Sequence, residues 1–521
     1  TNSQIYCNNS ANSTGLYNDN IVLENTNAAS DGVLFGVSNG NGTLAANKTI
    51  TIGGGGFVGG QLYFRNFTQV GPTNHTLIPT GTTVFNNYNS DWGGNVDFRA
   101  SRMYSRETTY RQTAILEKTG AISDASAGGN TFIGNAQLIN SGSGYFLMGN
   151  GIPDSCLANL DLLNSGTHYL YLGYNSVNNF VNGNLSITNS ASGAGTTNID
   201  VSTLAASSLT INGITTINNN TTSITGRVYL GNQGDITCNN LLNITNNSTS
   251  TNSQIYCNNS VNSTGIYNDN IILENINATA DGILFGASGG NSTLTATNTI
   301  TIGGGGFVAG QLYFRNFTQV GPTNQTLLGT GTTGIQNYDS DWGGNIDFRA
   351  PRMYTRGTLY RQTAILEKTG ANSDNSIGGN TFSGNAQLIN SGSGYLLMGN
   401  GSPDSCLANL DMNNSGTHYM YFAYNSANNF VGGNFSITNT GSGPNAGIYV
   451  SNSATTSLDV IGNTTVNSSP TSNSSTVSIG NLGTFSTFGN FIGTMMKNQK
   501  RFFTLATSFL YRQICFEVLK M

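Results

Sequence analysis

The sequence predicts an all-β protein, a parallel β-solenoid (β-helix) of two tandem homologous modules. Three observations support this fold: a long internal duplication, short alternating segments at a regular spacing, and a composition unsuited to helices. The opening TNSQIYCNNSANSTGLYNDN returns from residue 251 as TNSQIYCNNSVNSTGIYNDN, and the likeness runs from 1 to about 189 and from 251 to about 439. A period of about 250 residues is too long for one supersecondary unit, so each copy is expected to contain smaller units.

The composition excludes a helical protein and a disordered one. Only 8% of residues are charged and 68 are glycine, while Asn, Ser and Thr are also abundant. These types are poor in helix interiors and favour turns. The 37% hydrophobic content is regularly spaced, which argues against disorder. A net charge of −5 offers no basic surface, so nucleic acid is not expected as a partner. No stretch is apolar enough to predict a membrane span.

The smaller unit is an alternating segment that recurs about every 24 residues. The runs FIGNAQLIN, CLANLDLLN and FVNGNLSITN begin at Phe132, Cys156 and Phe180, and their copies begin at Phe382, Cys406 and Phe430. Alternation bounded by Gly, Asn and Ser is typical of a strand with one buried face. Further strands are expected at 144–150 and 168–175. Each module should therefore hold about ten stacked turns.

The ends of these runs predict an asparagine ladder. Asn140, Asn164 and Asn189 close successive runs, so we expect their side-chain amides to bond from turn to turn. The competing architecture is a string of tandem β-sandwiches. Its mark would be two-residue Asn-Gly hairpins, and these are only sporadic here, so the solenoid is preferred.

Three segments are expected: a first β-repeat module over 1–250, a second over 251–494, and a C-terminal helical cap or tail over 495–521. The tail has no Gly or Pro, and Phe502, Leu505 and Phe509 have helical spacing. It is interpreted as a capping helix or as a gene-boundary artefact, because MMKNQKRFF resembles the start of an export signal. The chain begins at a repeat boundary without Met or a signal peptide, which suggests processing or a fragment of a longer array.

The duplication also tests candidate catalytic residues, because an essential residue should normally survive in both copies. His75, Lys48 and Glu107 do not, since Gln325, Asn298 and Gly357 replace them. His168 recurs as His418 but has no metal-ligating neighbour in sequence. Free buried thiols are expected rather than a bridge between Cys238 and Cys257. No catalytic residue, metal site or cofactor is predicted.

Two groups of residues remain as candidate contacts for a glycan or a partner. The first is charged, and carboxylates beside arginines could bind or cut an acidic polysaccharide, although simple pairing among themselves is the preferred interpretation. The second is aromatic, and tyrosine rows can hold sugars or a partner surface. The charged group is Asp97 and Arg99 with their copies Asp347 and Arg349. The aromatic group is Tyr145, Tyr169 and Tyr171 with their copies Tyr395, Tyr419 and Tyr421.

The phrases ITIGGGGFVGGQLYFRNFTQ, TAILEKTG and NSGTHYLYLGYNS resemble the repeats of very large secreted, adhesin-like surface proteins of Bacteroidetes. The resemblance implies export, an extracellular or cell-surface location, and an adhesive or fibre-forming role. We therefore expect a non-enzymatic structural or adhesive repeat protein, a stiff segment of a surface adhesin or a self-assembling filament. Its partners would be further copies or neighbouring repeats of a longer chain, with surface glycans as another candidate. The alternative is a β-helix that binds or cleaves polysaccharide.

Overall fold

The computed structural model describes residues 3–28, 31–124, 127–279, 281–374, 376–471, 475–480 and 482–495, together with the backbone of 503–505, 509–510 and 514–518. The described residues form strands and no helix. The fold is a parallel β-solenoid of about 19 turns, which confirms the predicted fold class. Described strands pair in parallel with strands one turn away, so the alternative of hairpin-built sandwiches is wrong.

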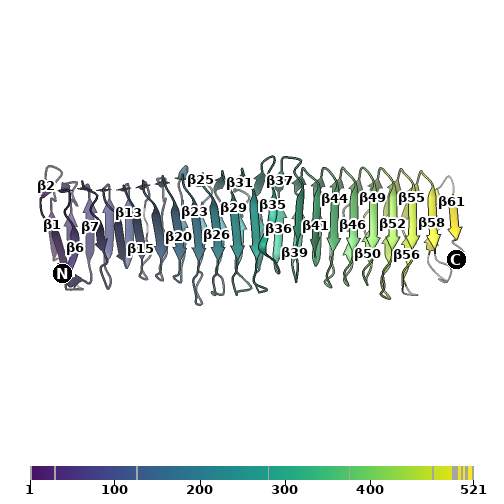
Figure 1. Ribbon diagram of the computed structural model, residues 1–521, viewed down its shortest axis with the longest axis horizontal. Coiled ribbons are helices and arrows are strands. Elements are labelled where there is room, and N and C mark those ends of the chain that lie inside the picture. The colour runs from purple at the N-terminus through teal and green to yellow at the C-terminus, as the bar shows by residue number, and fades with distance from the viewer. Residues whose placement is uncertain are drawn as a thin grey trace. The chain divides into compact units, whose positions relative to one another are not determined.

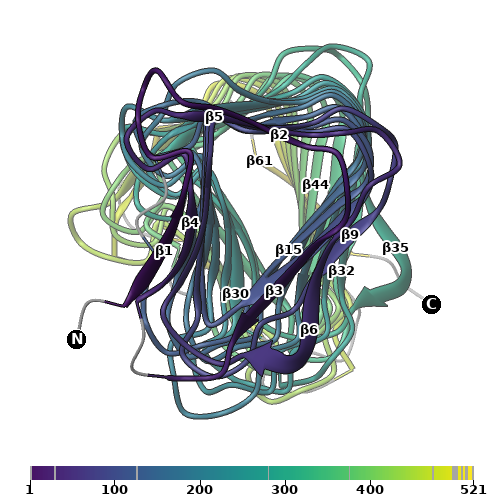
Figure 2. The same ribbon diagram turned by 90° about the vertical axis from the view of Figure 1, so that its left-hand side faces the viewer.

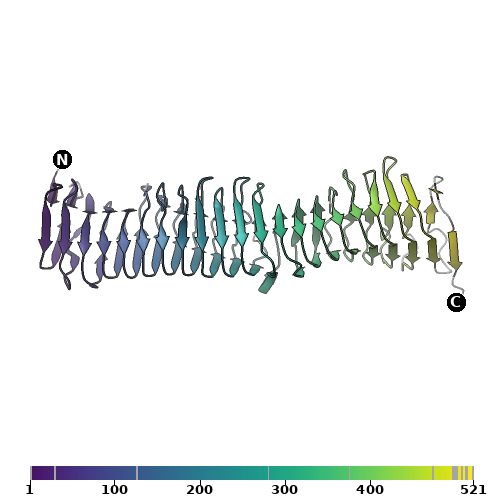
Figure 3. The ribbon, with the colours of Figure 1, turned by 90° about the horizontal axis from the view of Figure 1, so that it is seen from above.

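Contacts divide the chain into two units, each described by itself. Unit 1 is Thr1–Asn270 with Thr279–Asp281 and Gly286–Gly290, and unit 2 is Ile271–Ala278, Gly282–Phe285 and Asn291–Met521. The division therefore falls inside the second copy of the repeat. Within a unit, a complete turn places one strand on each of three faces (Figures 1 and 3). Figure 2 shows unit 1 along the direction in which its turns stack. Strands β1 and β4 lie on one side, β2 and β5 on a second side, and β3 on a third.

In unit 1 the faces hold the following strands. Face 1 holds β2 (Thr14–Tyr17), β5 (Asn41–Leu44), β8 (Phe67–Gln69), β11 (Asp91–Trp92), β14 (Thr109–Tyr110), β16 (Thr131–Phe132), β19 (Ser155–Cys156), β22 (Asn179–Val181), β25 (Ser208–Ile211), β28 (Asp235–Cys238) and β31 (Thr264–Tyr267). Face 2 holds β3 (Ile21–Asn25), β6 (Ile50–Phe57), β9 (His75–Leu77), β12 (Val96–Ala100), β15 (Ala114–Lys118), β17 (Ala136–Asn140), β20 (Leu160–Asn164), β23 (Leu185–Asn189), β26 (Thr215–Asn219) and β29 (Leu242–Asn246). Face 3 holds β1 (Gln4–Cys7), β4 (Gly32–Phe35), β7 (Gln61–Arg65), β10 (Val84–Tyr88), β13 (Arg102–Arg106), β18 (Phe146–Leu147), β21 (Leu170–Leu172), β24 (Ile199–Val201), β27 (Val228–Leu230) and β30 (Gln254–Cys257).

Unit 2 repeats this arrangement. Face 1 holds β34 (Asn291–Leu294), β37 (Phe317–Gln319), β40 (Asp341–Trp342), β43 (Leu359–Tyr360), β45 (Thr381–Phe382), β48 (Ser405–Cys406), β51 (Asn429–Val431), β54 (Ser457–Val460) and β57 (Thr484–Thr487). Face 2 holds β32 (Ile271–Asn275), β35 (Ile300–Phe307), β38 (Gln325–Leu328), β41 (Ile346–Ala350), β44 (Ala364–Lys368), β46 (Ala386–Asn390), β49 (Leu410–Asn414), β52 (Phe435–Asn439), β55 (Thr464–Ser468) and β58 (Phe491–Met495). Face 3 holds β33 (Gly282–Phe285), β36 (Gln311–Arg315), β39 (Gly334–Tyr338), β42 (Arg352–Arg356), β47 (Leu396–Leu397), β50 (Met420–Phe422), β53 (Ile448–Val450) and β56 (Val477–Ile479).

Alternation along each face 2 strand builds the core. In β20, Leu160, Leu162 and Asn164 are buried, while the residues between them are partly exposed. Strands pair in register, so inward residues form columns. The central column of face 2 is fully buried and includes Phe98, Leu116, Leu138, Leu162, Ile187, Ile217 and Ile244. Burial of each such side chain stabilises the fold by about 1.5–3 kcal/mol.

Face 1 corrects one predicted equivalence. Phe132 and Cys156 lie inward in register, but the next inward residue is Val181 rather than Phe180. Phe180 instead pairs with Ser155, and Phe430 pairs with Ser405 in the second copy. The prediction aligned Phe132, Cys156 and Phe180 by their even spacing. The polar Asn179 instead occupies an inward position one place before Phe180 and displaces the alternation by one residue.

The predicted asparagine ladder forms, with mostly different partners. Asn140, Asn164 and Asn189 are in register and fully buried. Asn140 Nδ2 donates to Tyr169 O at 3.0 Å, and Asn164 Nδ2 donates to His168 O at 2.9 Å. The amides therefore satisfy loop carbonyls behind face 2. A direct bond between ladder amides occurs from Asn219 Nδ2 to Asn246 Oδ1, at 3.3 Å.

The expected C-terminal helix over 495–521 is not found in the described part of that segment. Its described backbone forms β59 (Phe503–Leu505), β60 (Phe509–Leu510) and β61 (Ile514–Val518), which pair in parallel with β56, β57 and β58. Aromatic and β-branched residues such as Phe503, Thr504 and Ile514 suit strands as well as a helix, and the preceding turn supplies a ready edge to pair with. Backbone pairing thus outweighs the helical spacing.

Candidate ligand-binding face

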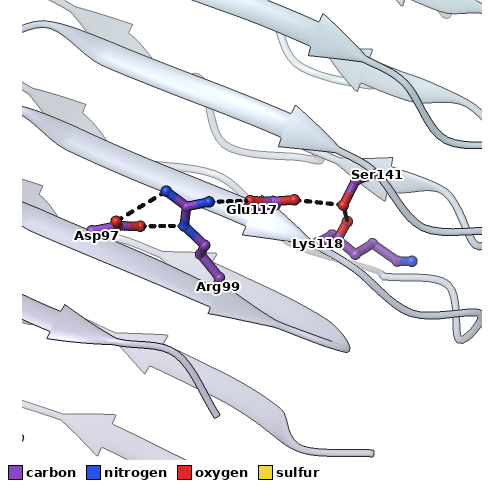
Figure 4. Close-up of polar contacts among 5 residues, drawn as sticks. All are labelled: Asp97, Arg99, Glu117, Lys118 and Ser141. Atoms are coloured by element: carbon purple, nitrogen blue, oxygen red, sulfur yellow. Dashed lines mark hydrogen bonds and ion pairs between the residues drawn. The ribbon is translucent and has the colours of Figure 1, made fainter. Parts of the chain in front are cut away.

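The charged candidate residues lie on the outward side of face 2. In unit 1, Arg99 Nε and Nη2 donate to the two carboxylate oxygens of Asp97 at 2.7 and 3.1 Å. Arg99 Nη1 donates to Glu117 Oε2 on the next turn at 3.1 Å. Glu117 Oε1 accepts from Ser141 Oγ at 2.5 Å, one turn further along (Figure 4). The hydrogen bond with Asp97 raises the pKa of Arg99. The cluster is a chain of mutually bonded groups across three turns.

Unit 2 holds the same cluster. Arg349 Nε donates to Asp347 at 2.7 Å, Arg349 Nη1 donates to Glu367 at 3.0 Å, and Ser391 Oγ donates to Glu367 at 2.6 Å. In both copies the carboxylates are already bonded to an arginine. A general acid needs a raised pKa and a general base needs a free lone pair aimed at substrate. This geometry therefore fits charge pairing better than catalysis.

A groove runs along face 2 of unit 1, beginning next to this cluster. Its volume is about 560 Å³. The floor is a column of outward residues in register, one per turn. The column continues from Asp97 through Ile115, Gln137, Asp161, Ser186 and Thr216. Gln137 Nε2 donates to Asp161 Oδ2 at 3.3 Å, so the floor has both amide and carboxylate groups.

One edge of the groove is a row of exposed asparagines, Asn135, Asn159 and Asn184. Each uses its side-chain oxygen to accept a backbone N–H from the next turn: Asn159 N to Asn135 Oδ1 at 3.3 Å, and Asn184 N to Asn159 Oδ1 at 2.8 Å. Ile214 N donates to Asn184 Oδ1 at 2.9 Å. A backbone N–H can only donate, so each amide must direct its oxygen at the backbone and its NH2 elsewhere.

Unit 2 carries the same row. Asn409 N donates to Asn385 Oδ1 at 3.3 Å, Asn434 N to Asn409 Oδ1 at 2.8 Å, and Asn463 N to Asn434 Oδ1 at 2.9 Å. A groove of about 300 Å³ lies on this face too, next to Asp347 and Thr363. Gln387, Asp411 and Ser436, the counterparts of the unit 1 floor residues, are in register as in unit 1 but do not line this smaller groove.

The tyrosine candidates lie on face 3, so the structure does not bring them together with Asp97 and Arg99. Tyr171 contacts Tyr145, Tyr169 and Tyr174, with ring centroids 6.0, 5.2 and 5.2 Å away. In unit 2, Tyr421 contacts Tyr395 at 6.1 Å and Tyr419 at 5.8 Å. The predicted aromatic patch therefore exists in both copies, with its rings partly exposed and packed on one another.

Two buried ionisable residues near these groups, Asp200 and Lys118, were not among the predicted contact residues. Asp200 pairs in register with Tyr171 and Tyr229, is only 4% exposed, and has its pKa raised by burial to about 7. Aligning IDV at 199–201 with LYL at 170–172 and VYL at 228–230 would have placed Asp200 in the same column as Tyr171 and Tyr229. Lys118 is fully buried in the column of the asparagine ladder, where its ammonium donates to Gly120 O near the buried Asp124. Burial lowers the Lys118 pKa.

The histidines serve structural roles. His75 is 1% exposed, and its Nδ1 accepts the Ile50 backbone N–H at 3.2 Å. His168 Nδ1 accepts the backbone N–H of Tyr169 at 2.9 Å, and His418 does the same for Tyr419 at 2.8 Å. Cys156, Cys238, Cys257 and Cys406 are buried free thiols, so the expectation of no Cys238–Cys257 bridge is confirmed.

Within the described part of the chain, no cluster of three His, Cys, Asp or Glu side chains is arranged to hold a metal ion. Nor do those residues include a helix that could span a membrane. Comparison of the chain with protein families, curated proteins and solved structures found no match.

Proposed function

We propose that this chain is a non-enzymatic structural and adhesive repeat protein, located outside the cell or on its surface. The observation that carries the proposal is the in-register parallel stacking of turns that share one alternating pattern, with a coat of amides and hydroxyls in place of charge. The described strands hydrogen-bond to the strands of neighbouring turns, which makes such a unit stiff. The bonded state of Asp97, Arg99 and Glu117 supports a non-catalytic role.

Self-association is part of the proposal. In the first turn of unit 1, Ile5 is 60% exposed, whereas its counterpart Ile255, which stacks on Val228 of the turn before it, is fully buried. Leu16 and Val22 in the same first turn are outward residues and are 66% and 63% exposed, and Ile266, the counterpart of Leu16, is also 38% exposed. This end presents both apolar side chains and unpaired strand edges, which suit another copy or neighbouring repeats of a longer chain.

The test of the proposal is direct imaging and adhesion. Purified protein examined by negative-stain electron microscopy is expected to form particles longer than one chain, and protein-coated beads are expected to adhere to cell or glycan surfaces. Dispersed single particles that do not adhere at any concentration would refute both roles.

The second candidate, a polysaccharide-cleaving β-helix, is favoured by the groove next to Asp97. It is tested by incubation with polygalacturonate and alginate, comparing the native chain with Asp97→Asn plus Asp347→Asn. Release of reducing ends by the native chain that the variant loses would establish cleavage. We expect no release by either protein.

A further inference from the structure

We propose that the groove on face 2 of unit 1 binds an extended, uncharged polysaccharide through the row Asn135, Asn159 and Asn184. The inference deepens the proposed adhesive function by naming a ligand class and a site. Its biological use rests on that function, but binding by the purified chain does not.

The donors of the asparagine row are preorganised. The backbone N–H of the following turn fixes each Asn oxygen, so the three NH2 groups keep one orientation without help from a ligand. Successive donors are one turn apart, about 4.8 Å. A ligand that meets this row gains hydrogen bonds without the usual cost of ordering flexible side chains. A linear polymer with oxygen atoms at a regular repeat matches such a row better than a compact molecule does.

The groove offers both donors and acceptors but no positive charge. Beside the donors, the Asp161 carboxylate is a partly exposed acceptor on the floor, and Thr216 and Ser186 supply hydroxyls. Arg99 is at the end of the column but is already bonded to Asp97 and Glu117. No lysine or arginine is among the residues that line this groove. A polyanion would therefore meet Asp161 without compensation, whereas sugar hydroxyls both donate and accept.

The shape of the groove also suits an extended chain. The groove floor extends over four turn-to-turn steps from Ile115 to Thr216, which is about 19 Å. Ile115 at one end and Ile214, 38% exposed, on the asparagine edge add apolar surface against which the C–H faces of a sugar can pack. An open groove of this length accommodates the interior of a chain and does not require its end.

The experiment is affinity electrophoresis of the full chain in native gels containing hydroxyethyl cellulose, galactomannan, laminarin, polygalacturonate or chitosan. The test variant is Ser186→Trp plus Ser436→Trp, which places a bulky ring on the floor of the unit 1 groove and at the equivalent position of the second copy. The matched control is Thr188→Trp plus Thr438→Trp, which adds the same ring to the same strands at outward positions that do not line the groove. Circular dichroism and the thermal midpoint establish that both variants fold.

The expected result is retardation of the native chain by at least one neutral polysaccharide, with affinity at least tenfold weaker in the Ser186→Trp pair and unchanged in the control pair. The inference is overturned if no neutral polysaccharide retards the native chain, if only polygalacturonate or chitosan does, or if both tryptophan pairs bind like the native chain. Binding to glycan without adhesion to cells would leave the site intact and refute the adhesive function. Adhesion to cells without glycan binding would refute the proposed site and leave the adhesive function standing.

Discussion

At the scale of the residue, the two copies of the repeat act as a natural mutagenesis experiment. His75 becomes Gln325, yet both side chains accept the same backbone N–H, from Ile50 at 3.2 Å and from Ile300 at 2.7 Å. Gln325 Nε2 also donates to Asn298 O at 3.0 Å, a bond His75 lacks. The position therefore requires a buried acceptor rather than an imidazole.

The histidine at position 75 predicts that His75→Gln makes the stability of the protein less dependent on pH in acid. Burial lowers the pKa of His75 to about 4, from 6.5. Between these values the unfolded chain binds a proton that the folded chain excludes, so the free energy of unfolding falls by about 1.4 kcal/mol per pH unit as the pH drops. His75→Gln should remove this contribution. Thermal midpoints at pH 4.5 and 7 should differ less in the variant than in the native chain, and an equal difference would show that His75 is not buried in its neutral form.

The buried carboxylates predict the opposite pH dependence. Burial raises the pKa of Asp154 and of Asp404 to about 6, from 3.8. The folded chain then holds a proton that the unfolded chain releases, so the stability contribution is present below pH 3.8 and is lost as the pH rises through 6. Asp154→Asn plus Asp404→Asn should raise the free energy of unfolding at pH 8 by up to about 3 kcal/mol per site, and by much less at pH 4.

This prediction is checked by circular dichroism melts at both pH values, with the partly exposed Asp161→Asn as control. Asp154 Oδ1 accepts from Asn130 N and Nδ2 at 2.8 and 2.9 Å, and an asparagine oxygen can replace it. A gain that is the same at pH 4 and pH 8 would contradict the assignment.

At the scale of the element, each face 2 strand is defined by its pattern and closed by its last residue. The buried amide of Asn164 donates to His168 O at 2.9 Å and Asn198 O at 3.2 Å, which lie in two successive loops. Strand β20 is thereby connected to the loop that leads to β21 and to the corresponding loop of the next turn. The loops after successive face 2 strands differ in length, but the buried amide at the end of the strand still bonds to loop carbonyls.

Removal of this amide should cost stability without changing the strand. Asn164→Leu has a similar volume but removes a donor shared by two carbonyls. Asn198 O still accepts Leu170 N at 2.9 Å and His168 O still accepts Asn140 Nδ2 at 3.4 Å, so the loss is expected to cost about 1 kcal/mol. The control is Leu163→Asn, an outward change that the second copy already carries as Asn413, and it should stay within about 0.5 kcal/mol. Guanidinium unfolding of both variants is the measurement. Equal midpoints would show that water replaces the lost donor.

The strands themselves could be predicted because alternation and in-register stacking reinforce each other. The runs after Phe132 and Cys156 contain β17 and β20, as expected. What could not be read from the sequence was register at insertions, as with Phe180, and the partner of each buried amide, because loop conformation decides both. The expected helix in 495–521 failed for a related reason, since tertiary pairing overrides local spacing.

The candidate site could be predicted only in part. The Asp97–Arg99 pair and the tyrosine patch were identified as groups, but their placement on different faces depends on the turn geometry. The asparagine row escaped notice because Asn is abundant throughout the chain, and only its backbone bonds distinguish Asn135, Asn159 and Asn184 from other surface amides. Position within the turn, rather than residue type, carries the information.

At the scale of the whole molecule, the first turn of unit 1 predicts how copies associate. Ile5 is exposed in this turn although its counterpart Ile255 is buried, so Ile5→Lys should reduce end-to-end assembly by loss of apolar contact and by the cost of burying a charge. Sedimentation velocity over a concentration series is the measurement, with Val177→Lys, an exposed side-surface residue, as control. A control that reduces assembly as strongly as the end variant would exclude the end as the contact.

Equivalent strands such as β17 and β46 occupy the same place in their turns and have the same burial pattern, one repeat of about 250 residues apart. Recombination between the two repeat copies within the gene would therefore delete or add a whole number of turns. The strands on the two sides of the new junction would already have matching burial patterns. Chains of many different lengths are accessible in this way without a new interface ever having to evolve.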